Sequence, residues 1–227
     1  MELKEIQKQT YQKSLYHTAK YLLNYSDITA NTHSQIIEAL ECETKRKLIC
    51  VPRGTFKSSI GCVSYPIWLL INNPNLRILI DSEIYTNSKN FLREIKAHLS
   101  SPALTDLYGE FYNPTIWNES EISIKQRTDI KKEASITVSG IGAVKVGQHY
   151  DVIIMDDMNS NNNSLTEEGR RKVVDHYRLN VAILDPGGIM VVIGTRYSED
   201  DLIGHILKNE IGGIYAERSV QTGILGL

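Results

Sequence analysis

Four short runs of consecutive apolar residues alternate along this chain with segments of helical periodicity. The runs read KLICV at 47–51, LRILI at 76–80, DVIIM at 151–155 and GIMVVIG at 188–194. Strands that are apolar throughout are typical of sheets buried on both faces, and helical crossovers between strands favour parallel pairing. The alternation therefore predicts an α/β domain with a mostly parallel central sheet and helices on both faces.

Helical periodicity and turn residues predict the remaining elements. Helices are expected at 57–70, 86–99, 165–184 and 199–207. A hairpin is expected from 122–126 and 134–140, a last strand at 213–220, irregular chain at 102–118, and an exposed loop in NSNNNS at 159–164. Tyrosines and leucines at helical spacing predict helices before residue 45. We therefore divide the chain into an N-terminal helical segment, 1–45, on or near a core that spans 46–227.

Composition narrows the classes of protein to consider. The apolar runs are too short to cross a bilayer and the N-terminus is polar, so neither a membrane span nor a secretory signal is expected. The net charge of −2 means that any contact with nucleic acid must use a local basic patch. The 3 cysteines, an odd number without CxxC spacing, argue against a disulfide framework and favour a reducing interior.

The stretch PRGTFKSS follows the first apolar run, at the carboxyl end of a predicted strand, where ligands bind on sheets of this kind. Lys57 and Ser58 match the end of the phosphate-loop pattern G-x-x-x-x-G-K-[ST], but Val51 and Phe56 stand where the pattern has glycine. Alone, the stretch fits both a deviant phosphate loop and an ordinary strand-to-helix turn. The nucleotide-binding candidates in it are Arg53, Gly54, Thr55, Phe56, Lys57, Ser58 and Ser59.

Two further polar clusters follow buried strands. Asp156 and Asp157 come after DVIIM, where one carboxylate could hold Mg²⁺ through water and the other could orient an attacking water, although aspartates also cap turns. Together with the Lys-Ser loop, the pair favours nucleotide hydrolysis. Thr195 and Arg196 follow GIMVVIG and would lie beside these acids, near the γ-phosphate. Ser198 is expected to cap the next helix. Helix capping does not explain the polar residues Thr195 and Arg196, which precede the cap.

His33 and Gln35 lie about one helix before the loop, where such side chains could read the edge of an adenine. The alternative is a helix start at Asn31 or Thr32 with the histidine ring packed on its own helix, and this interpretation is favoured.

These motifs, in this order, resemble the N-terminal ATPase domain of the large terminase subunit, the DNA-packaging motor of tailed double-stranded DNA viruses. PRGTFKSS resembles the deviant Walker A loop of that family, VIIMDD its Walker B strand, and IMVVIGTRYSEDDL its coupling motif. HSQIIEAL is similar to the stretch through which the family approaches adenine. The resemblance covers about residues 31–207 and implies a P-loop NTPase fold of the RecA-like (ASCE) type.

The resemblance also implies roles for single residues. Lys57 would bind phosphate, Ser58 would bind Mg²⁺, and Arg53 would lie near the γ-phosphate of ATP. Asp156 would hold the metal through water, and Asp157 would be the catalytic carboxylate at a position where many members have glutamate.

Thr195 and Arg196 would couple the phosphate state to motion. Ring-forming members use a basic residue from the neighbouring subunit, and Lys145, just before the Walker B strand, is the candidate here. A solvated loop lysine is the favoured alternative for Lys145, because lysine lacks the fork of an arginine finger.

Further expectations follow from the family alone. The cofactors would be ATP and Mg²⁺, and the partners double-stranded DNA, the portal protein and the small terminase subunit, with a homo-oligomeric ring on the procapsid in the host cytoplasm. Full-length members continue into a nuclease domain, which we do not expect in this chain.

Two other functions stay open. One is a helicase-like ATPase acting on another nucleic acid, which normally has a second lobe. The other is a nucleotide-binding assembly module that does not hydrolyse, in which Val51 and Phe56 would mark a decayed site.

Overall fold

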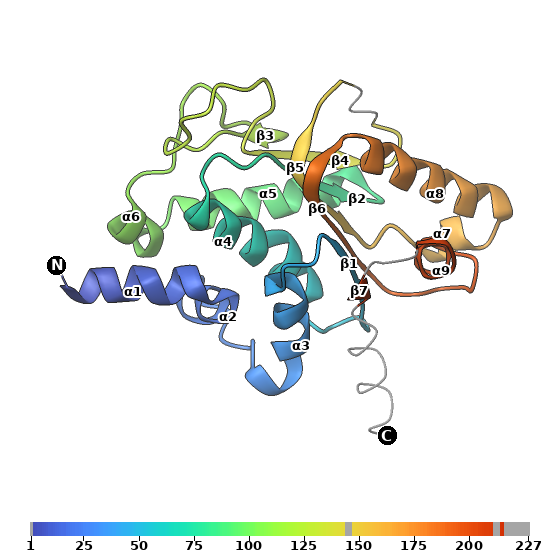
Figure 1. Ribbon diagram of the computed structural model, residues 1–227, viewed down its shortest axis with the longest axis horizontal. Coiled ribbons are helices and arrows are strands. Elements are labelled where there is room, and N and C mark those ends of the chain that lie inside the picture. Colours follow the sequence, from blue (N-terminus) through green and yellow to red (C-terminus); the bar gives the residue numbers. More distant parts are fainter. Residues whose placement is uncertain (1, 144–146, 211–213, 216–227) are drawn as a thin grey trace.

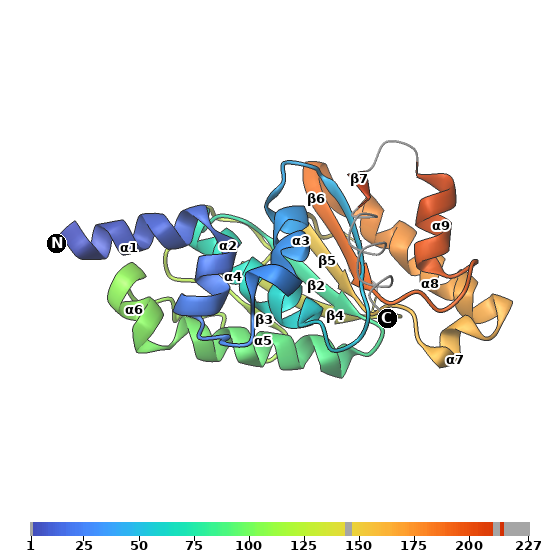
Figure 2. The same ribbon diagram turned by 90° about the horizontal axis from the view of Figure 1, so that it is seen from below.

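The computed structural model describes residues 2–143, 147–210 and 214–215. Its described strands form a 7-stranded sheet in the order β3-β4-β2-β5-β6-β1-β7. Helices cover both faces, with α8 and α9 on one side and α3, α4 and α5 on the other (Figures 1 and 2). The predicted α/β class with a mostly parallel sheet is therefore confirmed.

Most strands of the sheet are parallel. They are β1 (Arg46–Cys50), β2 (Ile78–Ser82), β4 (Ile136–Gly140), β5 (Tyr150–Asp156), β6 (Leu184–Gly194) and β7 (Ile214–Tyr215). The short strand β3 (Glu121–Ile122) pairs with β4 in the antiparallel direction. Strand β6 lies between β1 and β5, so the three strands that precede the predicted site residues are neighbours.

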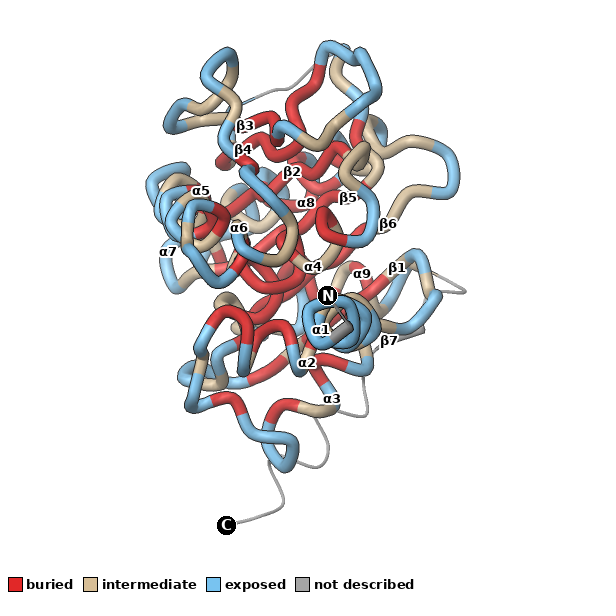
Figure 3. Tube along the Cα trace, turned by 90° about the vertical axis from the view of Figure 1, so that its left-hand side faces the viewer, coloured by how far each residue is buried: buried red, intermediate tan, exposed pale blue. Residues whose placement is uncertain are grey.

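Side chains along the central strands alternate between two apolar cores, and this explains the continuous apolar runs. Ile80 and Ile154 belong to one core, whereas Leu79 and Ile153 belong to the other. The central strands are accordingly buried except for the exposed Pro186 and Gly187 of β6, and most other exposed positions lie in loops and on the outer sides of helices (Figure 3).

The helices that cover the first face include the one that follows the phosphate-loop candidate. They are α3 (Ala30–Glu41), the π-helix η2 (Ser59–Ser64), α4 (Tyr65–Asn72) and α5 (Tyr85–Leu99). A β-carbon built on Gly61 would lie 2.1 Å from Cδ1 of Ile193, so glycine lets η2 approach β6 closely. Helices α8 (Glu167–Ala182) and α9 (Leu202–Asn209) cover the second face.

The N-terminal segment is helical, with α1 (Glu2–Lys13), α2 (Leu15–His17) and the π-helix η1 (Thr18–Leu22) before α3. It lies against α4, because the Trp68 indole donates to the Gln12 carbonyl at 3.0 Å and the Gln12 amide donates to the Ile71 carbonyl at 3.1 Å. The boundary at residue 45 stays a prediction. Within the described ranges, no helix is long and apolar enough to cross a bilayer.

Two stretches expected to lack helix contain short helices. Helix α6 (Pro102–Tyr108) begins with the proline that had suggested irregular chain, because proline is well suited to the first turn, where its missing N–H is not needed. Helix α7 (Asn161–Ser164) lies within the predicted loop, and its start is stabilised by reciprocal bonds between Ser160 and Asn163.

Element ends account for the other corrections. Helix α9 is capped by Asp201, whose carboxylate accepts from the Gly204 N–H at 2.9 Å, so the prediction of Ser198 as its cap is wrong. The first arm of the hairpin is shorter than 122–126 but pairs antiparallel as expected. Of the last strand predicted at 213–220, only residues 214–215 are described, and they pair with β1.

Candidate functional site

The carboxyl ends of four adjacent strands bring the predicted site residues together. In the registers of β1, β6, β5 and β2, Cys50 pairs with Gly194, Ile193 with Asp156, and Asp156 with Ser82. The loop after β1, the acids at the end of β5 and the segment after β6 therefore emerge at one edge of the sheet, which is where ligands bind on sheets of this type.

Two direct contacts join the loop after β1 to the acids after β5. The Ser58 hydroxyl lies 3.0 and 2.9 Å from the two carboxylate oxygens of Asp156, 98 positions along the chain. The Lys57 ammonium forms an ion pair with Asp157, with Nζ 3.0 Å from Oδ2. Lys57 is only 6% exposed, so its charge is held at the site rather than in solvent.

Asp156 is buried and its ionisation is perturbed. Burial, followed by the charge of Asp157, raises the pKa of Asp156 to about 7, while the Ser58 hydroxyl and the Lys57 charge oppose the rise. A bound cation would favour the ionised form of this carboxylate.

Ser58 and Asp156 together suit a hard cation. A hydroxyl and a carboxylate side by side are oxygen ligands of the kind that Mg²⁺ binds, usually together with waters and substrate phosphates. The contact between Ser58 and Asp156 places both oxygen donors within reach of one ion, so the residues present fit the Mg²⁺ that the resemblance predicts.

The backbone of the loop takes two left-handed conformations. Gly54 has φ 81° and Phe56 has φ 52°, the second at the position where the standard pattern has glycine. The left-handed region costs a residue with a side chain about 1–2 kcal/mol. The Phe56 ring meets the His33 ring edge-to-face, with the centroids 5.8 Å apart, and this contact offsets part of that cost.

A pair of substitutions at Phe56 separates the energetic effect of the backbone strain from that of the ring contact. Phe56→Ala keeps the left-handed strain and loses the ring contact, whereas Phe56→Gly loses the contact but relieves the strain. We expect Phe56→Gly to be more stable than Phe56→Ala by about 1 kcal/mol, measured as the free energy of unfolding in urea. Equal stability of the two variants would contradict a strained backbone at this position.

The segment after β6 touches the loop through Thr195 and Tyr197. The Thr195 hydroxyl donates to the Val51 carbonyl at 3.2 Å. The Arg53 guanidinium donates to the Tyr197 hydroxyl and lies 5.8 Å from the centre of its ring. Arg196 instead is exposed and donates to the Ser198 carbonyl at 3.2 Å. Sequence reasoning missed Tyr197, whose only signal was its place two residues after Thr195.

Of the remaining predicted residues, His33 touches the loop through its ring contact with Phe56. His33 is buried in α3, and its Nδ1 lies 3.0 Å from the backbone nitrogen of Thr29, the residue that precedes the helix. The bond to Thr29 fits a helix start, but the cap is Thr29 rather than Asn31 or Thr32, and the ring also packs on Phe56 of the loop rather than on its own helix alone. Gln35 is exposed on the same helix, and Lys145 lies outside the described residues.

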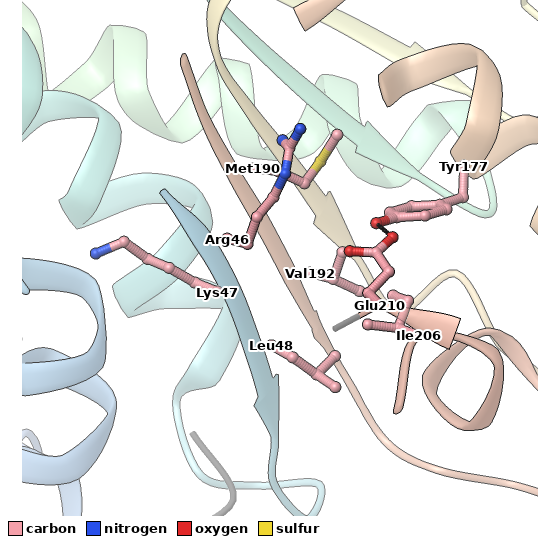
Figure 4. A pocket seen from close by; sticks show the side chains of 8 residues that line it. All are labelled: Arg46, Lys47, Leu48, Tyr177, Met190, Val192, Ile206 and Glu210. Carbon is pink, nitrogen blue, oxygen red and sulfur yellow. Dashed lines mark hydrogen bonds between the residues drawn. The ribbon is translucent and has the colours of Figure 1, made fainter. Parts of the chain in front are cut away.

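A small pocket beside the amino half of β1 and the part of β6 paired with it does not belong to this site (Figure 4). It is lined by Arg46, Lys47, Leu48, Tyr177, Met190, Val192, Ile206 and Glu210. In Figure 4 the Lys47 side chain points away from the others, and its ammonium donates to three carbonyls at the end of α3, at 2.6–2.9 Å. Lys47 is therefore a buried structural lysine, not part of a basic surface patch.

No family model and no curated protein matches the sequence. Among solved structures, the crystal structure of the HK97 bacteriophage large terminase is similar, with a TM-score of 0.59 at 10% sequence identity. The match covers 87% of this chain and 41% of that one, so the chain spans less than half the length of the terminase. The resemblance to a large terminase inferred from the motifs is thus confirmed at the level of the fold.

Proposed function

We propose that this chain is a Mg²⁺-dependent ATPase that powers the movement of double-stranded viral DNA, as the ATPase part of a packaging motor. The observation that supports this most is the double contact between the loop and the acids: Lys57 with Asp157, and Ser58 with Asp156. A strand-to-helix turn with a solvated lysine, the alternative for this stretch, does not account for a lysine that is 6% exposed.

The residues suggest how hydrolysis proceeds. Lys57 would exchange Asp157 for the phosphate oxygens of ATP and neutralise the charge that develops on them. Asp157, released from the ion pair, would orient the attacking water and accept its proton. Mg²⁺, when bound at Ser58 and Asp156, would supply further positive charge to the phosphates.

Arg53 and Thr195 would link the state of the nucleotide to movement. Arg53 lies on Tyr197 in this structure and would have to leave that ring to reach a γ-phosphate. Such an exchange would change the contact between the loop and the segment after β6. Thr195, bonded to the Val51 carbonyl, would transmit the change to the end of β1.

The partners follow from the same proposal. They would be double-stranded DNA, a portal protein, a small terminase subunit and further copies of this chain in a ring, in the host cytoplasm. Lys145 is the candidate for a residue that acts on the neighbouring subunit. Because trans-acting arginines contribute about 10³–10⁵ in rate, we expect an isolated monomer to hydrolyse ATP slowly.

Phosphate release tests the proposed function. The parent chain at high concentration should release phosphate from ATP only when Mg²⁺ is present, and Asp157→Ala should lower the rate by about 10²–10⁴-fold, the usual size of a lost general base. Asp175→Ala, which removes an exposed aspartate on α8 paired with Arg178, is the matched control and should keep the parent rate.

The alternatives give different outcomes. Nucleotide binding without phosphate release, at any protein concentration and with DNA present, would favour the assembly module. Activity stimulated by single-stranded but not double-stranded nucleic acid would favour a helicase-like ATPase. A chain that binds no nucleotide at all would contradict both enzyme readings.

A further inference from the structure

Asp157, the carboxylate that would orient the attacking water, has an unusual backbone. Its φ of 43° lies in the left-handed region, which residues with a side chain seldom adopt. Such a conformation persists where the surrounding structure holds it. The N–H of Asp157 donates to the Ile193 carbonyl of β6 at 2.9 Å, which fixes the chain as it leaves β5. The left-handed turn also needs a restraint on the segment that follows it.

Glu83, the residue after β2, provides this restraint. Its Oε1 accepts hydrogen bonds from the Ser160 hydroxyl at 2.6 Å and from the side-chain amide of Asn163 at 3.0 Å. The same Asn163 amide donates to the carbonyl of Met158, the residue next to Asp157, at 2.8 Å. A single carboxylate oxygen is thus bonded twice to the turn that carries Asp157.

The register of the sheet explains why Glu83 lies beside this turn. Ser82 pairs with Asp156 across β2 and β5, so the residues that follow, Glu83 and Asp157, emerge at the same edge of the sheet. The chain after Glu83 is closely packed as well, because a β-carbon on Gly140 of β4 would lie 2.7 Å from the backbone nitrogen at the start of α5. Glu83 therefore joins the turn to a well-packed part of the fold.

The chemistry of its partners shows what the carboxylate does. The hydroxyl of Ser160 and the amide of Asn163 are neutral donors, so Glu83 acts towards the turn as a hydrogen-bond acceptor and not as half of an ion pair. An uncharged side chain of the same length that keeps an acceptor oxygen should therefore serve in its place.

We propose that Glu83 is a positioning residue for Asp157: by accepting from Ser160 and Asn163, it holds the turn after β5 so that the Asp157 carboxylate stays directed at the loop after β1. The inference rests on the proposed function, in which Asp157 orients the attacking water. Glu83 acts through the turn and takes no part in the proton transfer. Its effect on the rate follows from geometry, because a displacement of about 1 Å at a reacting group can cost about 10²-fold.

The test separates the hydrogen bonds of Glu83 from its charge. Glu83→Gln keeps an oxygen that can accept from both donors, whereas Glu83→Ala removes the acceptor. Glu41→Ala is the matched control, because Glu41 is also half-buried and accepts from a distant segment, the Leu15 N–H, at 2.5 Å. For each chain, phosphate release at saturating Mg²⁺ gives kcat and KM for ATP. Amide hydrogen exchange of residues 157–163 is measured without nucleotide.

We expect Glu83→Ala to lower kcat by about 10–100-fold and to leave KM within about twofold of the parent value, since the phosphates are bound by the loop and not by Glu83. Amide exchange at 157–163 should become about tenfold faster, because the turn has lost its restraint. Glu83→Gln should stay within about threefold of the parent in kcat and in exchange. Glu41→Ala should match the parent in both, even if it unfolds at a lower urea concentration.

Asn163→Ala tests the same connection from its other end and leaves Glu83 in place. It should lower kcat and speed the exchange of the turn in the same direction as Glu83→Ala. The double variant should be no slower than the slower of the two single variants, because both substitutions break one connection. This variant also decides the matter if Glu83→Ala does not fold.

Three outcomes would overturn the inference. Parent-like amide exchange at 157–163 in Glu83→Ala and in Asn163→Ala would mean that these bonds do not hold the turn, whatever the activity of the chain. Equal losses of kcat in Glu83→Gln and Glu83→Ala would mean that the charge matters and not the hydrogen bonds. If the parent releases no phosphate while exchange at 157–163 does depend on Glu83, the proposed function fails, and the part of Glu83 in catalysis fails with it.

Discussion

Replacing Lys57 with alanine is expected to lower ATP hydrolysis by about 10²–10³-fold and to weaken nucleotide binding. Lys57 is a buried cation at the start of a helix, 3.0 Å from a carboxylate that it must exchange for phosphate. Alanine offers no charge to the phosphate oxygens. It also leaves Asp157 without its ion pair at a site that is already acidic. Steady-state phosphate release with saturating Mg²⁺ and ATP measures the effect.

The loss should come from the site rather than from unfolding. The Asp157 side chain is 39% exposed, so water can solvate it when Lys57 is removed, and the cost in stability should be small. Lys89→Ala is the control, because Lys89 on α5 forms an ion pair with Glu119 at 3.2 Å between side chains more exposed than those of Lys57 and Asp157. Lys89→Ala should keep the parent rate. A Lys57→Ala chain with more than a tenth of that rate would contradict the proposed role.

Much of the fold could be predicted because the strands of a parallel sheet are buried on both faces and this burial is visible in the sequence. A strand with helices on both faces must be apolar at successive positions, and KLICV, LRILI, DVIIM and GIMVVIG all lie within strands or begin within two residues of them. The failures have local physical causes. Pro102 suggested irregular chain, although the first turn of a helix accepts proline. Ser198 and Asp201 are both suitable N-cap residues, and which of them caps the helix depends on the tertiary fold.

The site was predictable to the extent that it follows strand ends. Lys57, Ser58, Asp156, Asp157 and Thr195 come directly after buried strands, and the parallel topology brings them to one edge. Tyr197 was missed because its part depends on a contact with Arg53, which lies far along the chain. The sequence showed only that Phe56 departs from the glycine pattern and did not predict its left-handed φ. The contact of its ring with His33 joins two segments that lie far apart in the sequence.

Asp156 gives the largest expected effect on stability, and its direction depends on pH. Its pKa lies near 7 in the folded chain, against 3.8 for an unperturbed aspartate, so the folded state binds a proton more tightly than the unfolded state does. Between about pH 4 and pH 7 the folded chain therefore holds a proton that the unfolded chain has released, and stability falls as the pH rises. Above pH 7 both states are ionised and the loss is complete.

In Asp156→Asn the side chain cannot ionise, so the variant should not lose stability between pH 4 and pH 7 through this group. Without nucleotide or Mg²⁺, we expect the variant to unfold at a higher urea concentration than the parent at pH 8. Its free energy of unfolding should be larger by up to about 4 kcal/mol, because each pKa unit of the shift corresponds to about 1.4 kcal/mol. The gap should shrink toward zero near pH 4 and stay level above pH 7. Phosphate release should be lost in the same variant, since the amide cannot replace the carboxylate at a cation site. A gap of constant size from pH 4 to pH 8 would mean that Asp156 is ionised in the folded chain throughout, and that its burial is compensated by contacts stronger than those with Ser58 and Lys57.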